Sequence, residues 1–298
     1  FTSPQSSEKE ALHRVEHAGV CQLLKAGTIE DHHYLLLSYY GQQTLMDRVE
    51  QGIPISELTR IFLQIAGALD ALHQQGYAHG DLRPEHVLIK SNGQPVLIDL
   101  GSAYRTDEDD TPVSADRSGS PAYLSPERIQ AASSTVAHQE TARSGAGDYY
   151  ALGVIAFQLL SGRLPFSDES REAVLQAHLQ DSVPKLPSHL QTLQPVIDGL
   201  MAKNPQQRTS NAVALQALFD AAELDAELAG RVARSAAIDT QELSALFAEL
   251  RLRPDELALQ NKRLRRKRRR RIALQSSVAL IFAGSLLAGL FTFRAEPL

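Results

Sequence analysis

The chain has 298 residues, 30 of them basic and 35 acidic, so its formal net charge is −5. Its single cysteine, Cys21, excludes a fold held together by disulfide bonds and fits a reducing compartment. The charge is unevenly placed, because nine of the ten residues from 262 to 271 are Lys or Arg, and without them 21 basic side chains remain against 35 acidic ones. An acidic body is therefore joined to a strongly basic segment.

The first part of the chain predicts one helix, two strands and then a longer helix. Glu8 lies on the first predicted helix, and residues 21–26 and 34–38 are the predicted strands, separated by a short turn. Apolar residues at helical spacing between Pro54 and Gly76 predict a helix that begins after the proline and ends at the glycine.

Two short apolar runs, Val87–Ile89 and Val96–Ile98, flank the turn residues Asn92-Gly93 and predict a β-hairpin. A hairpin brings its open ends together, so Asp81, which precedes the first strand, is expected near Asp99, which follows the second. One carboxylate can orient a hydroxyl while the other holds a metal ion, and these two functions form the core of a phosphoryl-transfer site. The ordinary alternative is that both aspartates cap turns, as Asp commonly does.

The rest of the chain up to residue 222 is predicted to be mainly helical. Helices are expected over residues 148–161, 172–179, 190–202 and 211–222. Residues 131–147 are rich in Ala, Ser, Thr and Gly, which is typical of an inserted loop.

Five short motifs follow one another between residues 79 and 208. They are His79-Gly80-Asp81-Leu82-Arg83-Pro84-Glu85-His86, Asp99-Leu100-Gly101, the segment Gly119 to Glu127, Asp148-Tyr149-Tyr150-Ala151-Leu152-Gly153, and Asn204-Pro205-Gln206-Gln207-Arg208. Their order and spacing resemble those of a eukaryotic-type serine/threonine protein kinase of the bacterial group. The resemblance implies an α+β, protein-kinase-like two-lobe fold, with a partial small lobe and hinge at residues 1–40 and a mainly helical large lobe at residues 41–222.

The resemblance also implies the catalytic residues and the cofactors. Asp81 matches the residue that accepts or orients the substrate hydroxyl proton, and Asp99 matches the Mg²⁺ ligand. Arg83 stands where the family usually has Lys and would contact the transferring phosphoryl group, unless it is a surface arginine. The segment Gly119 to Glu127 resembles the kinase substrate-docking segment, and Glu127 and Arg208 resemble a structural buried ion pair that ties this segment to the C-terminal lobe. The implied cofactors are ATP and Mg²⁺, with Mn²⁺ as the alternative metal, and the implied substrates are protein hydroxyls.

A nucleotide site is implied where the two lobes meet. Its gatekeeper would be Leu37, its hinge Ser38, Tyr39 and Tyr40, its floor Leu88, and its lysine-pairing acid Glu8. Leu37 and Leu88 could equally be ordinary core residues and Glu8 a solvated helical one. Neither the ATP-binding lysine nor a glycine-rich loop is found, so we expect the sequence to start inside a truncated small lobe.

Two residues depart from the family pattern. His86 replaces the Asn that helps to coordinate a metal, and imidazole favours softer metals than Mg²⁺. His86 could instead be an ordinary hydrogen-bonding histidine at the start of a strand, an interpretation that we favour. Gly80 replaces the Arg that pairs with a phosphate on the activation segment in many kinases, so we expect any activity to be independent of phosphorylation there.

The C-terminal part predicts a membrane anchor. Residues 223–271 are expected to form a helical juxtamembrane segment that packs on the large lobe, pairs with a second copy of the chain or is a simple stalk. Residues 272–293 are uncharged and long enough for one transmembrane helix, followed by a short tail at 294–298. The basic run at 262–271 places the kinase-like domain in the cytoplasm by the positive-inside rule. Anionic lipid headgroups are a nearer partner for this run than a nucleic acid.

The sequence thus predicts a protein kinase that phosphorylates Ser or Thr on proteins and is anchored by a single span in the inner or plasma membrane. The alternative is a pseudokinase that acts as a membrane-tethered scaffold, because His86 and Gly80 both weaken the catalytic pattern.

Overall fold

The computed structural model describes residues 4–30, 32–50, 54–107, 120–131 and 142–227. Most of the predicted juxtamembrane segment, all of the predicted span at 272–293 and the tail at 294–298 lie outside these ranges. Within them, no helix combines the length and the apolar character needed to cross a bilayer.

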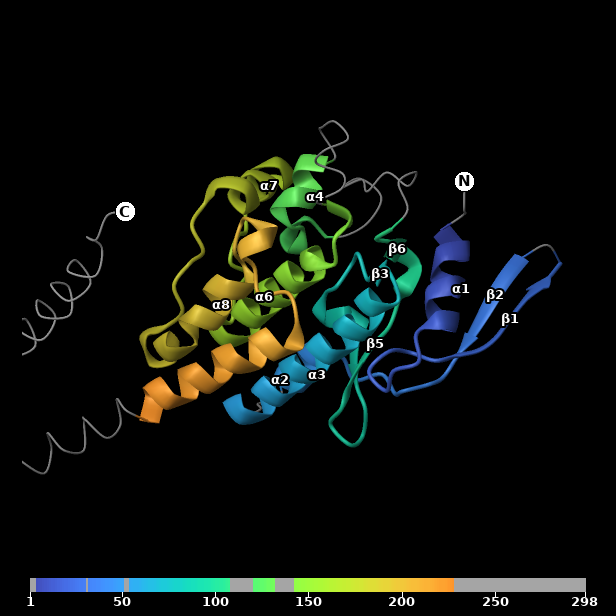
Figure 1. The fold of residues 1–298 in the computed structure, drawn as a ribbon, viewed down its shortest axis with the longest axis horizontal. Coiled ribbons are helices and arrows are strands. Elements are labelled where there is room, and N and C mark those ends of the chain that lie inside the picture. Colours follow the sequence, from blue (N-terminus) through green and yellow to red (C-terminus); the bar gives the residue numbers. More distant parts are fainter. Residues whose placement is uncertain (1–3, 31, 51–53, 108–119, 132–141, 228–298) are drawn as a thin grey trace, which may run out of the picture. The chain divides into compact units, whose positions relative to one another are not determined.

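The N-terminal elements are one helix and one β-hairpin. Helix α1 (Pro4–Arg14) is followed by strands β1 (Leu23–Ile29) and β2 (His32–Leu37), which pair antiparallel from Leu23 opposite Leu37 to Ile29 opposite His32. Figure 1 shows α1 beside this hairpin. The predicted strands were too short at the turn, because pairing continues to Ile29 opposite His32, and Glu30, with a φ of 47°, lies in the turn that reverses the chain.

Helix α3 (Ile55–Gln74) is the long helix predicted between Pro54 and Gly76. Its apolar stripe is buried in the core and comprises Leu58, Ile61, Phe62, Ile65, Leu69 and Leu72. Gly76 ends the helix with a φ of +78°, a conformation that costs glycine little. The short helix α2 (Leu45–Glu50) precedes α3.

Two small β-pairs follow α3 and carry the motif residues. Strand β3 (Tyr77–Ala78) pairs antiparallel with β6 (Tyr104–Arg105), and β4 (Val87–Ile89) pairs with β5 (Pro95–Leu97). The predicted hairpin is therefore confirmed, and Gly93 has the positive φ that its turn requires. Single 3₁₀ turns, η1 (Pro84–His86) and η2 (Leu100–Ser102), stand beside the hairpin ends.

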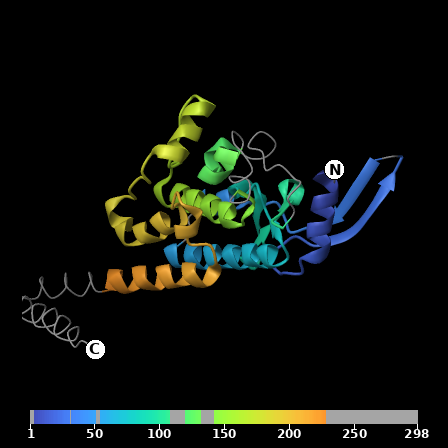
Figure 2. The same cartoon turned by 45° about the horizontal axis from the view of Figure 1, so that its top comes forward.

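The remaining described part is helical, as predicted. Its elements are η3 (Pro121–Tyr123), α4 (Pro126–Ala131), α6 (Ala146–Ser161), α7 (Arg171–Gln180), η4 (Ser188–Leu193), α8 (Gln194–Leu200), η5 (Pro205–Gln207) and a helix over 212–227. Helix α6 is buried from Gly147 to Phe157 and ends at Gly162, which also has a positive φ. Figures 1 and 2 show the last helix running beside α3, where the Ala212 amide donates to Asp70 Oδ2 over 2.9 Å.

Candidate active site

The β4–β5 hairpin places His86 between the two candidate catalytic carboxylates. His86 Nδ1 lies 2.8 Å from the backbone oxygen of Asp81 and 3.7 Å from Asp81 Oδ2, while His86 Nε2 lies 3.4 Å from Asp99 Oδ2. A carbonyl oxygen only accepts, so Nδ1 must donate its proton to Asp81. The Nε2 of a neutral ring is then an acceptor that faces a carboxylate, and a cation or a proton between them would relieve this opposition.

Asp99 holds its carboxylate at the surface of the site through an unusual backbone conformation. Its φ of 59° and ψ of 71° are left-handed, which is uncommon for a residue with a side chain. Asp99 Oδ1 accepts from the Gly101 amide over 3.3 Å, and the side chain is 55% exposed. One oxygen is therefore fixed by the loop, while the other faces His86 and remains accessible to a ligand.

A buried carboxylate, Asp148 of α6, holds the loop that carries Asp81. The backbone amide of His79 donates to Asp148 Oδ2 over 2.8 Å and that of Gly80 to Oδ1 over 3.0 Å. His73 Nε2 donates to Asp148 Oδ2 over 2.8 Å. Burial opposes ionisation, but the bonds from His73 and the Gly80 amide prevail and lower the pKa of Asp148 to about 2.

His79 fixes the same loop from inside the core. Its side chain is fully buried, its Nε2 donates to the Ile98 carbonyl over 3.2 Å, and its Nδ1 accepts from the Asp81 amide over 3.3 Å. Burial lowers the pKa of His79, which keeps the ring neutral and suits this pair of bonds. His79 thus joins the Asp81 loop to the strand end that leads to Asp99.

Arg83 pairs with a neighbour rather than directly with Asp81. Its Nε donates to Glu85 Oε2 over 2.8 Å, and its side chain is 32% exposed. The bond to Glu85 raises the pKa of Arg83, with a smaller contribution from Asp81. The guanidinium therefore lies at the edge of the site with part of its donor fork occupied.

Glu8 of α1 reaches the loop that follows Asp99. Its Oε2 lies 3.8 Å from the position that a Cβ atom would take on Gly101. Burial and the Asp99 carboxylate raise the pKa of Glu8. The structure therefore brings Asp81, His86, Asp99 and Glu8 together.

The hydrogen bonds described for the predicted hinge residues are made with Gln22. Leu37 is partly buried against the core, the Ser38 amide donates to the Gln22 carbonyl over 2.9 Å, and Tyr39 is 80% exposed. Leu88 is half-buried on β4, where its backbone pairs with Thr44.

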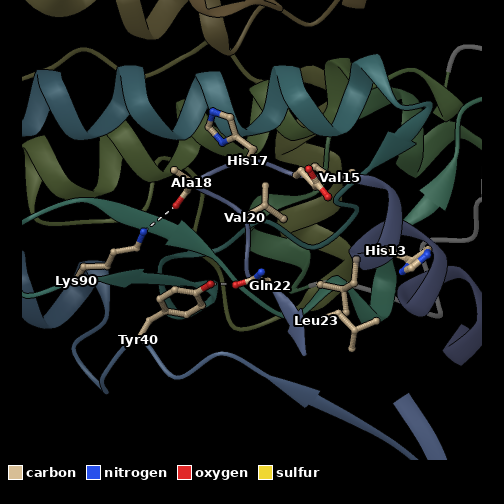
Figure 3. A pocket seen from close by; sticks show the side chains of 11 residues that line it. His13, Val15, His17, Ala18, Val20, Gln22, Leu23, Tyr40 and Lys90 are labelled. Atoms are coloured by element: carbon tan, nitrogen blue, oxygen red, sulfur yellow. Dashed lines mark hydrogen bonds between the residues drawn. The ribbon is translucent and has the colours of Figure 1, made fainter. Parts of the chain in front are cut away.

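Tyr40 turns its side chain toward a hollow of about 720 Å³ at the end of α1. The Tyr40 hydroxyl accepts from the backbone amide of Gln22 over 3.1 Å, and Lys90 donates to the Ala18 carbonyl (Figure 3). Neither Asp81 nor Asp99 lines this hollow. The side chain of Tyr40 therefore belongs to the wall of this hollow, and only its backbone is left for the predicted contact with adenine.

The donors around Asp99 fit a metal ion that is completed by other ligands. Within the described ranges, no three His, Cys, Asp or Glu side chains converge on one metal position. Mg²⁺ commonly uses one or two carboxylates together with phosphate oxygens and water. An exposed Asp99 oxygen beside an acceptor nitrogen of His86 is consistent with such a partial set.

The predicted ion pair between Glu127 and Arg208 is confirmed. Arg208 Nη1 donates to Glu127 Oε1 over 2.6 Å and Nη2 to Oε2 over 2.9 Å, and both side chains are buried. The pair links α4 to Arg208, which directly follows the 3₁₀ turn at Pro205–Gln207.

Three further residues of the site were not predicted from the sequence. Asp148 stood within a motif, but its bonds to the Asp81 loop were not foreseen. His73 carried no signal, since it lies at the end of an amphipathic helix. Arg128 is buried and its Nη1 donates to the Gly80 carbonyl, although its only sequence signal is its place directly after a motif.

Comparison with known proteins supports the same interpretation as the geometry. The chain matches the protein kinase domain family over residues 3–219. It is 30% identical over 207 residues to a probable serine/threonine-protein kinase PknB of Lactococcus lactis, covering 67% of this chain and 32% of that protein. It is 28% identical over 228 residues to the serine/threonine-protein kinase PrkC of Bacillus subtilis, covering 73% and 34%. The chain therefore spans about a third of the length of these two relatives.

Proposed function

The chain belongs to the protein kinase family, and from this premise we propose that its site transfers the terminal phosphoryl group of ATP to Ser or Thr hydroxyls of proteins. The observation that carries the proposal is the placement of Asp81 and Asp99 on the two sides of His86, within 3.7 Å of its ring nitrogens. Relatives named as serine/threonine kinases support the choice of acceptor hydroxyl.

Each residue of the site has a distinct task in this reaction. Asp81 orients the acceptor hydroxyl and takes up its proton, and its loop is held in place by His79 and Asp148. Asp99 would hold the Mg²⁺ or Mn²⁺ ion, which neutralises charge on the phosphates when it is bound. Arg83 lies close enough to Asp81 to interact with it electrostatically, so its guanidinium would also attract the transferring phosphoryl group.

His86 contacts both catalytic carboxylates and bears on which metal ion the site prefers. Its Nδ1 donates to the Asp81 carbonyl over 2.8 Å, which supports a hydrogen-bonding role for the ring. Its Nε2 also faces Asp99, and a neutral imidazole nitrogen suits Mn²⁺ better than Mg²⁺. We expect His86→Asn to strengthen the response to Mg²⁺ relative to Mn²⁺.

The second candidate function is a binding module without efficient phosphotransfer. The contact of 3.4 Å between His86 Nε2 and Asp99 Oδ2 favours it, because the imidazole ring stands directly against the carboxylate that the metal needs. In this case the site would bind nucleotide or a partner without transferring phosphate.

The experiment separates binding from transfer in the full-length protein. Transfer from labelled ATP to a protein substrate is measured with Mg²⁺ and with Mn²⁺, and nucleotide affinity is measured in parallel. Asp81→Asn should retain nucleotide affinity and lose transfer, whereas Asp99→Asn should lose metal-dependent affinity. Asp168→Asn is the matched control, since this exposed aspartate accepts from the nearby Ser170 amide and lies outside the catalytic motifs. Nucleotide binding without transfer in the folded wild-type protein would support the second candidate instead.

We also propose that residues 272–293 anchor the protein by one span, with the kinase domain in the cytoplasm. The support is the uncharged length of this segment and the nine cations before it. Deleting residues 272–293 should move the protein from the alkali-washed membrane pellet to the supernatant. Unchanged sedimentation of the deleted form would contradict the anchor.

A further inference from the structure

Arg128 of α4 reaches across the fold to the loop that carries Asp81. It is buried, with 6% of its surface exposed, and its Nη1 donates to the Gly80 carbonyl. The amide of the same glycine donates to Asp148. Both backbone polar groups of Gly80 are therefore held by charged side chains that come from α4 and α6.

Gly80 cannot carry the arginine that the family pattern has at this position. Its φ is +81°, and a Cβ atom on it would overlap the Ser102 carbonyl oxygen and approach the Tyr104 ring at 3.1 Å. A side chain here would require the Ser102 backbone to move. The guanidinium next to this loop comes instead from Arg128, which lies 48 residues later in the chain.

The surroundings of Arg128 connect four segments of the fold. Its guanidinium carbon lies 5.6 Å from the centre of the Tyr104 ring on β6, a geometry suited to a cation–π contact. Its Cδ lies 3.4 Å from the position of a Cβ on Gly147, at the start of α6. Tyr104 in turn donates its hydroxyl to the Ala142 carbonyl over 3.2 Å. Arg128 thus joins α4, the Asp81 loop, β6 and the start of α6.

Two adjacent residues of α4 bind two different parts of the domain. Glu127 binds Arg208 in the C-terminal part of the domain, and Arg128 binds the Asp81 loop. Two residues separate helix α4 from η3 (Pro121–Tyr123), which belongs to the segment that resembles the kinase substrate-docking segment. The docking segment and the catalytic loop are therefore connected by side chains that need no phosphate.

We propose that Arg128 is a positioning residue that aligns the docking segment with the Asp81 loop and makes this alignment independent of phosphorylation. The inference rests on the proposed function, because it concerns the regulation of the same site. In many kinases a phosphate on the activation segment and an arginine at the position of Gly80 would link that segment to the catalytic loop. Here Arg128, packed on Tyr104, provides the link.

The test compares amide hydrogen exchange and kinetics in the full-length wild type, Arg128→Met and Arg128→Lys. Arg163→Met is the matched control, since this exposed arginine also covers an aromatic ring, Phe157, at 5.4 Å. In Arg128→Met, we expect exchange at residues 78–82 to rise by about 10- to 100-fold, as loss of a bond from a charged donor implies. Exchange in α3 should stay unchanged, and Arg128→Lys should be intermediate because one donor remains.

The kinetic arm should show a fall in kcat of about tenfold or more in Arg128→Met, with KM for ATP within about twofold of the wild type. Phosphatase treatment should leave the wild-type kcat unchanged.

Unchanged exchange at residues 78–82, or a rise that includes α3 equally, would overturn the proposal. Failure of both Arg128 variants to fold would also overturn it in favour of a purely structural role. A wild type that transfers no phosphate would contradict the proposed function. Hydrogen exchange is measured without turnover, so the comparison of exchange between wild type and the Arg128 variants would still test the role of Arg128.

Discussion

Replacing Asp148 by Asn should strongly destabilise the domain, although the two side chains have nearly the same shape. Asp148 Oδ2 accepts from the His79 amide and from His73, and Oδ1 accepts from the Gly80 amide. An asparagine can keep its oxygen at the Oδ2 position and preserve two of these bonds. Its amide group then faces the Gly80 amide, so two donors oppose each other in the core.

The size of the effect follows from these three bonds. The bonds from His73 and the His79 amide no longer go to a charged acceptor, which costs about 1 kcal/mol each. The buried Gly80 amide loses its acceptor, which costs about 1–3 kcal/mol. The expected loss in the free energy of unfolding is therefore about 3–5 kcal/mol. The folded-state pKa of about 2 is below the usual 3.8, so this group contributes its stability above pH ~4 and loses it as the pH falls toward 2. The difference between wild type and variant should shrink in that window.

The assay is urea unfolding followed by circular dichroism for wild type, Asp148→Asn and Asp168→Asn at neutral pH. The control removes the same charge at an exposed position and should change the free energy of unfolding by less than about 0.5 kcal/mol. A loss of under about 1.5 kcal/mol in Asp148→Asn, or a loss equal to that of the control, would refute the assignment of Asp148 as the anchor of the Asp81 loop.

Three more changes test other parts of the fold. Glu127→Gln breaks the buried ion pair of α4 and should cost about 3–5 kcal/mol in urea unfolding; a cost below about 1 kcal/mol would mean that the pair is not needed. Gly80→Ala should lower the melting temperature more than Gly162→Ala, because both have positive φ but only the first Cβ overlaps the Ser102 carbonyl; equal shifts would contradict this crowding. Burial lowers the pKa of His178 to about 4. As the pH falls from 6.5 to 4, the free energy of unfolding of the wild type should therefore fall by about 3 kcal/mol more than that of His178→Asn. Parallel pH profiles of the two proteins would argue against this cause.

The sequence predicted the elements whose signals are local. Pro54 and Gly76 marked the ends of α3, and the Asn92-Gly93 turn fixed the hairpin that brings Asp81 and Asp99 together. The turn between β1 and β2 was predicted too long, because the strands pair up to Ile29 opposite His32 and Glu30 reverses the chain with a positive φ that its residue type does not signal.

The contacts that hold the site together could not be predicted in the same way. Asp148 meets the amides of His79 and Gly80 across 69 and 68 residues of chain, and Arg128 meets Gly80 across 48. Such pairings depend on the packing of α4 and α6 against the loop, which no periodicity or spacing encodes. The family resemblance located the motifs, and the structure assigned the bonds between them.

The most direct measurement is the identity of the phosphorylated residue after transfer from labelled ATP to a protein substrate, in the full-length wild type and in Asp81→Asn. We predict phosphoserine and phosphothreonine with the wild type under Mn²⁺ or Mg²⁺, and none with the variant. Equal labelling by folded Asp81→Asn, or phosphotyrosine as the main product, would contradict the assignment of this site as a serine/threonine kinase centre.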